Sequence, residues 1–178
     1  MRTWALLGAS ALMALFGLLL GRNMMAQNLT AENPTLAELE QAAETDPFEW
    51  ADYMLTYVSR VTGTEMDGET RAKADEYAAR LGELDSNSIQ IHLAGYYLWT
   101  DRVELGFDLA ERYVGYVSSD ETAWQRTFAL LEEYEQDTLE YRAGVAHIAD
   151  LLDAWNAENM GHIALNEQAE TFITRMRG

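Results

Sequence analysis

The sequence predicts an all-α protein in which one hydrophobic amino-terminal segment precedes a helical domain. Three observations predict this. Residues 4 to 21 form an apolar run without a charged side chain. From Thr35 onward, apolar residues recur at the three- and four-residue spacing of amphipathic helices, with short breaks between the helical stretches. We find no sustained alternation of polar and apolar residues, which is the pattern typical of strands.

The apolar run is long enough to cross a membrane as a helix. At about 1.5 Å per residue it spans roughly 27 Å, close to the roughly 30 Å of bilayer hydrocarbon, whereas a signal-peptide core stops at roughly 7 to 15 residues. We therefore expect residues 1–22 to be a retained transmembrane anchor that contacts the lipid bilayer through residues 4–21. Small residues that are spaced by multiples of four positions lie on one face of this helix and predict packing against another transmembrane helix. They are Ala5, Ala9, Gly17 and Gly21.

The alternative is a cleaved secretory signal, with Ala26 as the last residue removed, which would release a secreted or periplasmic binding module. Met24 stands where the cleavage site prefers a small residue, and Arg22 lies between the apolar run and that site. These two residues favour a retained anchor.

Charge predicts the location of the domain and excludes some partners. Arg2 precedes the apolar run and Arg22 follows it, while the next basic residue is Arg60, so the positive charge at the amino terminus slightly favours a cytoplasmic start. We expect a single-pass protein of a bacterial inner membrane, with its domain in the periplasm or an equivalent extracytoplasmic space. The net charge of −18 disfavours nucleic acid and anionic lipid surfaces as ligands, since both need clustered Lys and Arg.

The helices follow in order after a polar linker at residues 23–34. The first begins at Thr35 and ends near Glu44. Asp46 is predicted as the N-cap of the second, with Pro47 at its first position, and this helix ends near Arg60. After a loop at residues 62–69, helices are expected near residues 70–84, 87–100, 103–117, 121–135 and 137–156. A final amphipathic helix places Leu165, Ala169, Phe172, Ile173 and Met176 on one face.

A repeated pattern runs through these helices. Each unit of the pattern has a large apolar residue, followed by further residues three, four and seven positions later. The pattern occurs as Trp50-Tyr53-Met54-Tyr57, Ile91-Ala94-Gly95-Leu98 and Trp124-Thr127-Phe128-Leu131. The pattern resembles the first helix of the tetratricopeptide repeat, W-x2-L-G-x2-Y with a period of about 34 residues. Residues 93–120 match best, as two helices whose close contact would need Gly95 and either Gly106 or Ala110.

The resemblance covers residues 47 to about 156. It implies a right-handed solenoid of helix pairs within residues 35–178. The last helix would be the cap that covers the end of the array and exposes a polar face to solvent. Asp85 and Ser118 replace the proline that usually closes the second helix of a repeat. A generic helical bundle is the structural alternative.

No group of residues predicts catalysis. His92, His147 and His162 belong to no H-E-x-x-H motif, cysteine is absent, and no phosphate-binding glycine loop occurs. His147 and Asp150 share a helix face, but two ligands are too few for a metal. The acidic residues Glu132, Glu133, Glu135, Asp137 and Glu140 are typical of a solvated face. We therefore expect no enzyme activity, no metal and no cofactor.

The first helices of a helix-pair solenoid form its concave face, and the repeat register assigns residues to that face. The candidate partner-binding residues are Leu55, His92, Tyr96, Trp99, Gln125, Arg126 and Glu132. An apolar and aromatic groove bordered by acid suits a partner helix or an extended peptide with basic flanks. Alternatively, Tyr96 and Trp99 belong to the core. We therefore expect a non-catalytic scaffold that is an accessory or assembly subunit of a membrane protein complex and binds other subunits of it.

Overall fold

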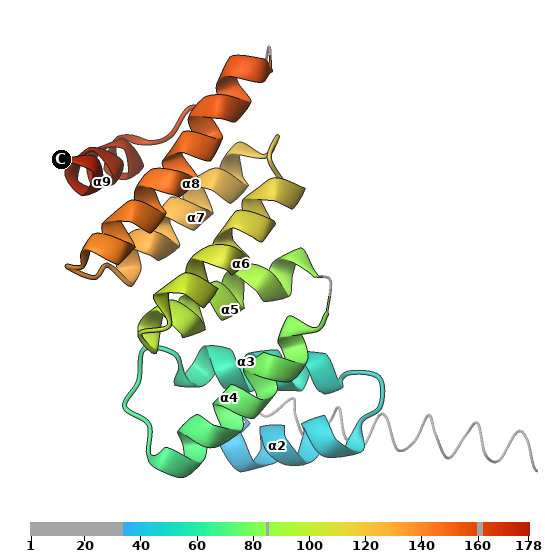
Figure 1. Cartoon of the computed structure of the whole chain (residues 1–178). Coiled ribbons are helices and arrows are strands. Elements are labelled where there is room, and N and C mark those ends of the chain that lie inside the picture. Colours follow the sequence, from blue (N-terminus) through green and yellow to red (C-terminus); the bar gives the residue numbers. More distant parts are fainter. Residues whose placement is uncertain (1–33, 85, 160–161) are drawn as a thin grey trace, which may run out of the picture. The chain divides into compact units, whose positions relative to one another are not determined.

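The computed structural model describes residues 34–84, 86–159 and 162–178, and within these ranges the secondary structure is helical, with no strand. This confirms the all-α prediction for that part of the chain. The helices are α2 (Leu36–Thr45), α3 (Trp50–Val61), α4 (Gly68–Gly82), α5 (Asn87–Trp99), α6 (Val103–Tyr116), α7 (Glu121–Glu133), α8 (Leu139–Glu158) and α9 (Glu167–Arg177) (Figure 1).

The chain divides into two compact units, one that ends at Tyr53 and one from Met54 to Gly178. The predicted anchor, its small residues Ala5, Ala9, Gly17 and Gly21, and nearly all of the predicted linker lie outside the described residues. Among the helices that the structure describes, none combines the length and the apolar character that crossing a bilayer requires.

In the first unit, α2 begins where the sequence predicts. Thr35 is its N-cap, and a capping box holds the first turn: the Glu38 backbone N–H donates to the Thr35 hydroxyl at 3.3 Å, and the Thr35 N–H donates to the Glu38 carboxylate at 2.6 Å. One face of α2 is buried through Leu39, Ala42 and Ala43.

The predicted start of the second helix needs correction. Asp46 accepts hydrogen bonds from the backbone N–H groups of Phe48 and Glu49, at 2.8 and 3.1 Å, and so caps a turn. Pro47 lies in that turn, and α3 begins only at Trp50. The Asp-Pro pair is equally suited to a turn and to a helix start, because both use the same side-chain acceptor and the same fixed φ.

In the second unit, the Tyr57 and Tyr77 rings of α3 and α4 pack edge to face, with centroids 5.3 Å apart. Helix α4 starts at Gly68, with Asp67 as its N-cap, so the predicted loop is shorter by two residues than expected. Helix α5 then packs along α6.

Gly106 permits the close packing of α5 and α6. A Cβ at this position would lie 2.6 Å from Leu98 Cδ2 and 3.2 Å from the Ala94 carbonyl oxygen. Its predicted role is therefore confirmed. Gly95 differs from the prediction, because it faces α7 and the residue after it: a Cβ there would lie 3.1 Å from Tyr134 Cε2 and 3.2 Å from Leu130 Cδ1.

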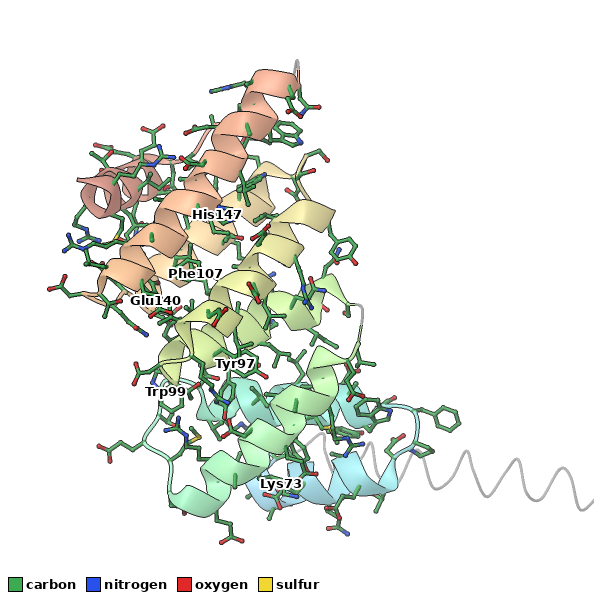
Figure 2. All side chains as sticks on the ribbon, viewed as in Figure 1. Lys73, Tyr97, Trp99, Phe107, Glu140 and His147 are labelled. Atoms are coloured by element: carbon green, nitrogen blue, oxygen red, sulfur yellow. The ribbon has the colours of Figure 1, made fainter. Side chains whose placement is uncertain are left out.

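A third glycine contact joins α6 to α8. A Cβ on Gly144 would lie 2.5 Å from Phe107 Cδ2, and the Phe107 ring packs edge to face on Tyr141 at 5.2 Å (Figure 2). Gly144 belongs to none of the patterns found in the sequence. A glycine inside a helical pattern is nevertheless a signal of close approach by another element.

The remaining helices of the second unit pack on one another and on the α5–α6 pair. Helix α7 contacts α5 and α6, α8 contacts α6, and α9 contacts both α7 and α8 (Figure 1). Trp124 of α7 is buried, and its indole N–H donates to the Ser118 carbonyl at 2.8 Å. The buried face of α9 comprises Ala169, Phe172, Ile173 and Met176, as the sequence predicts, while Leu165 precedes the helix.

Candidate functional site

A groove is lined by α3, α5 and α7, the three helices that begin the predicted pairs. It consists of two hollows, of about 290 and 420 Å³, that share Ser59 and His92. We call it the first-helix groove. Its lining residues are Leu55, Thr56, Ser59, Arg60, Thr62, Ile91, His92, Gly95, Arg126, Ala129, Leu130, Glu133 and Tyr134.

Basic side chains gather in this groove although the chain has a net charge of −18. Arg60, His92 and Arg126 line it, and Glu133 is the one carboxylate among its described lining residues. Burial, followed by the charge of Arg126, lowers the pKa of His92 from its ordinary 6.5. The imidazole is therefore neutral near pH 7, when it can both donate and accept a hydrogen bond. With Tyr134 and Glu133 as its aromatic and acidic lining residues, the groove is less aromatic and less acidic than the surface that the sequence predicts.

Arg126 is the most informative group in the groove. Its side chain forms no hydrogen bond and no ion pair with any part of the chain that the structure describes, whereas most arginines of the second unit do. A guanidinium offers five N–H donors and matches a carboxylate or a pair of carbonyl oxygens. The groove can therefore bind hydrogen-bond acceptors of a second molecule.

Three of the candidate residues come together here: Leu55, His92 and Arg126. The other four do not line the groove. Tyr96 is fully buried, and its hydroxyl donates to Asp75. Trp99 is half-buried at the end of α5 (Figure 2). Gln125 donates to Glu121 at 3.0 Å, and Glu132 accepts from Gln168 of α9 at 2.6 Å.

On α5, the predicted and the observed groove residues differ by one position along the helix. The predicted stripe contains Tyr96, but the groove-facing residues of α5 are Ile91, His92 and Gly95. One residue of an α-helix turns the side chain by about 100°, because a turn has 3.6 residues. This rotation is enough to move a side chain from a groove into the core.

Tyr96 instead belongs to a polar network at the turn between α5 and α6. Asp75 of α4 accepts from the Tyr96 hydroxyl at 2.6 Å and from the Arg102 guanidinium at 2.5 Å. The guanidinium also lies 5.2 Å from the Tyr96 ring centroid and 4.8 Å from that of Tyr97. Arg102 Nε completes the network by donating to the Thr100 hydroxyl at 3.0 Å. We call these residues the Asp75 network.

The pKa values in the Asp75 network have identifiable causes. Burial and the hydrogen bond to Asp75 raise the pKa of Tyr96 to about 12. Burial alone would raise the pKa of Asp75, but hydrogen bonds from Tyr96 and Arg102, together with the charge of Arg102, lower it below its ordinary 3.8. The network therefore holds an ionised carboxylate at neutral pH and ties α4 to the α5–α6 pair.

Several other polar residues that the sequence pattern singles out form hydrogen bonds or ion pairs with charged side chains of α6, α8 or α9. His147 lies 2.9 Å from Glu111 of α6, and Asp150 accepts from Arg177 of α9, so the two do not act together. Glu135 accepts from Arg175 at 2.7 Å, and Asp137 from Arg142 at 2.8 Å. Part of the predicted acidic face thus contacts α8 and α9.

Comparison with known proteins gives no relative from which a role could be transferred: no family model, no curated protein and no solved structure matches this chain.

Proposed function

We propose that this chain is a non-catalytic scaffold, anchored in a membrane by residues 1–22, which acts as an accessory or assembly subunit of a membrane protein complex. In this proposal the first-helix groove binds a segment of another subunit on the extracytoplasmic side. Arg126 carries the proposal, because a cationic group without a partner in the described structure lies in a hollow beside His92.

The composition of the groove favours a peptide segment as its ligand. Leu55 and Leu130 supply apolar surface, while Arg126 and the neutral His92 supply hydrogen-bonding groups along the same groove. A peptide presents both kinds of surface, since its side chains contribute apolar area and its carbonyl groups accept hydrogen bonds. We expect the bound segment to place acceptors, either carbonyl oxygens or a carboxylate, opposite Arg126.

The packing of the second unit supports a tetratricopeptide-like arrangement. The proposed first helices α5 and α7 contact each other, as do the proposed second helices α6 and α8. Helix α9 contacts both α7 and α8, which suits a cap that covers the end of an array. We propose on this basis that the helices of the second unit form a right-handed solenoid of helix pairs.

The proposal is tested by affinity purification of the full chain from membranes in a mild non-ionic detergent, with mass spectrometry of the chains that copurify. Arg126→Ala should reduce recovery of the partner several-fold. Gln125→Ala is the matched control: it lies one position away on α7, but its side chain bonds to Glu121 outside the groove, so recovery should not change.

Two results would contradict this scheme. Equal partner recovery with both variants would remove the groove from the interaction, and recovery of the protein alone under every mild extraction would remove the scaffold role. The intact mass of the mature chain tests the anchor separately, because a chain that starts at Gln27 would instead be the released binding module.

A further inference from the structure

A row of three basic side chains crosses the first-helix groove, one from each helix that lines it. Arg60 comes from α3, His92 from α5 and Arg126 from α7. We call these three residues the basic row. His92 has the middle position, because it lines both hollows, whereas each arginine lines one of them. A ligand that occupies both hollows therefore passes His92.

Hydrogen-bonding groups without partners surround this middle position. Ser59 is the other residue that lines both hollows. Ser59, His92 and Arg126 form no hydrogen bond or ion pair with the residues that the structure describes. All three can donate a hydrogen bond, and a carboxylate accepts strong hydrogen bonds from such groups because it is ionised.

Few negative groups oppose the basic row. Glu133 is the one carboxylate among the described lining residues, and Tyr134, whose pKa is raised by burial and then by Glu133, stays neutral. The two guanidinium groups thus outnumber the carboxylate near pH 7, and protonation of His92 adds a third positive charge. The net charge of −18 acts mostly from farther away, where salt at about 0.15 M screens exposed charges beyond about 8 Å.

The protonation of His92 is coupled to what the groove holds. In the free groove, burial and then the charge of Arg126 lower the pKa of His92 below its ordinary 6.5. A carboxylate bound beside the ring acts in the opposite direction, because it favours the charged imidazolium and so raises this pKa. Since the coupling is reciprocal, such a ligand binds more tightly to the protein in which His92 is protonated.

We propose that the first-helix groove binds an acidic segment of the partner subunit and that protonation of His92 strengthens this binding. Carboxylates of the segment lie along the basic row, and its apolar side chains contact Leu55 and Leu130. Acidification from about pH 7.5 to about pH 5.5 therefore tightens the complex. This inference rests on the proposed function, because it names the kind of segment that occupies the groove and the condition that regulates its binding.

The test uses the full chain in non-ionic detergent, with histidine labelled with ¹³C and the His92 signal assigned from its loss in His92→Gln. The probe is acetyl-Leu-Glu-Leu-Glu-Leu-amide, whose glutamates stay ionised between about pH 5.5 and 7.5. It should raise the pKa of His92 in an NMR titration. Calorimetry should show about fivefold tighter binding at the lower pH, the effect of one added charge pair at about 4 Å in water. The matched peptide with glutamine in place of glutamate should show neither effect.

Two histidine variants locate the pH dependence. His92→Gln keeps a hydrogen-bonding side chain that does not gain a charge, so it should bind the acidic peptide at about pH 7.5 as the unaltered protein does, without the gain at about pH 5.5. His147→Gln is the matched control. His147 of α8 (Figure 2) is exposed, bonds to Glu111 and does not line the groove, so this variant should keep the full pH dependence.

Three results would overturn the proposal: equal binding of the acidic and the glutamine peptide, no saturable shift of the His92 signal at millimolar acidic peptide, or the same pH dependence in His92→Gln as in the unaltered protein. Failure of the proposed function gives a different result, because recovery of the partner would then not depend on Arg126. If recovery depends on Arg126 while the two peptides bind equally, the groove binds a partner segment of another kind.

Discussion

Arg102 and Arg126 lie in two regions of the second unit and differ in how many hydrogen-bond partners their guanidinium groups have. Arg102 is held by the Asp75 carboxylate, by the Thr100 hydroxyl and by the rings of Tyr96 and Tyr97. Arg126 lines a groove and has no such partner in the described structure. The first arrangement joins helices of the chain to one another, whereas the second leaves hydrogen-bonding capacity for another molecule.

This contrast separates residues that stabilise the fold from residues that are available for binding. Partly buried polar groups contribute to stability when they have partners, and they cost free energy when they have none. Arg126 is exposed to solvent and has no hydrogen bond or ion pair within the described structure, so the fold does not depend on it, and in the first-helix groove we propose that it binds a partner. Substitutions in the two regions should accordingly affect different measurements.

The largest effect is expected from Tyr96. Tyr96→Ala removes a fully buried ring from the contact of α4 with α5, and should lower the free energy of unfolding by about 3 to 5 kcal/mol. Tyr96→Phe removes only the hydroxyl bonded to Asp75 and should cost about 1 to 2 kcal/mol. Urea unfolding followed by circular dichroism measures both. An unchanged midpoint for Tyr96→Ala would mean that this side chain is not core.

A smaller effect is expected from acid. The folded-state pKa of Asp75 is lowered, so its contribution to stability is present above its ordinary pKa of 3.8 and is lost as the pH falls through the folded value. Its size is about 0.5 to 1 kcal/mol, because the carboxylate is 38 % exposed and water screens the pair. Thermal unfolding between pH 2 and pH 7 should therefore show a weaker acid dependence in Asp75→Asn than in the unaltered protein.

The smallest effect on stability is expected in the groove. Arg126→Ala should change the free energy of unfolding by less than about 0.5 kcal/mol, because it removes no ion pair or hydrogen bond of the described structure. The same variant should show the largest loss of partner recovery. A destabilisation as large as that of Tyr96→Phe would show that Arg126 supports the fold, and the contrast between the two regions would fail.

Local signals in the sequence predicted most helix positions, because caps and apolar periodicity act within a few residues. Thr35 and Asn166 cap α2 and α9 through their own side chains, so the ends of these helices follow from nearby residues. The start of α3 was predicted three residues too early, since Asp46 satisfies a turn in the same way as a helix. Nothing within that segment decides between the two.

The site was predicted less well than the helices. Leu55, His92 and Arg126 line the first-helix groove, whereas Tyr96 and Trp99, from which an aromatic surface was expected, do not. A shift of one residue along α5 separates a groove position from a core position. The apolar pattern of α5 gives little help, because this helix is buried over most of its surface.

The sequence by itself determined that the described chain is helical, where most helices start and end, and which face of α9 is buried, because these properties depend on periodicity and on contacts a few residues apart. Tertiary structure alone decided that Tyr96 pairs with Asp75, that Gly95 faces α7, and that Arg126 has no partner among the described residues. These outcomes depend on how helices distant in sequence rotate against one another, and no local interaction fixes that rotation.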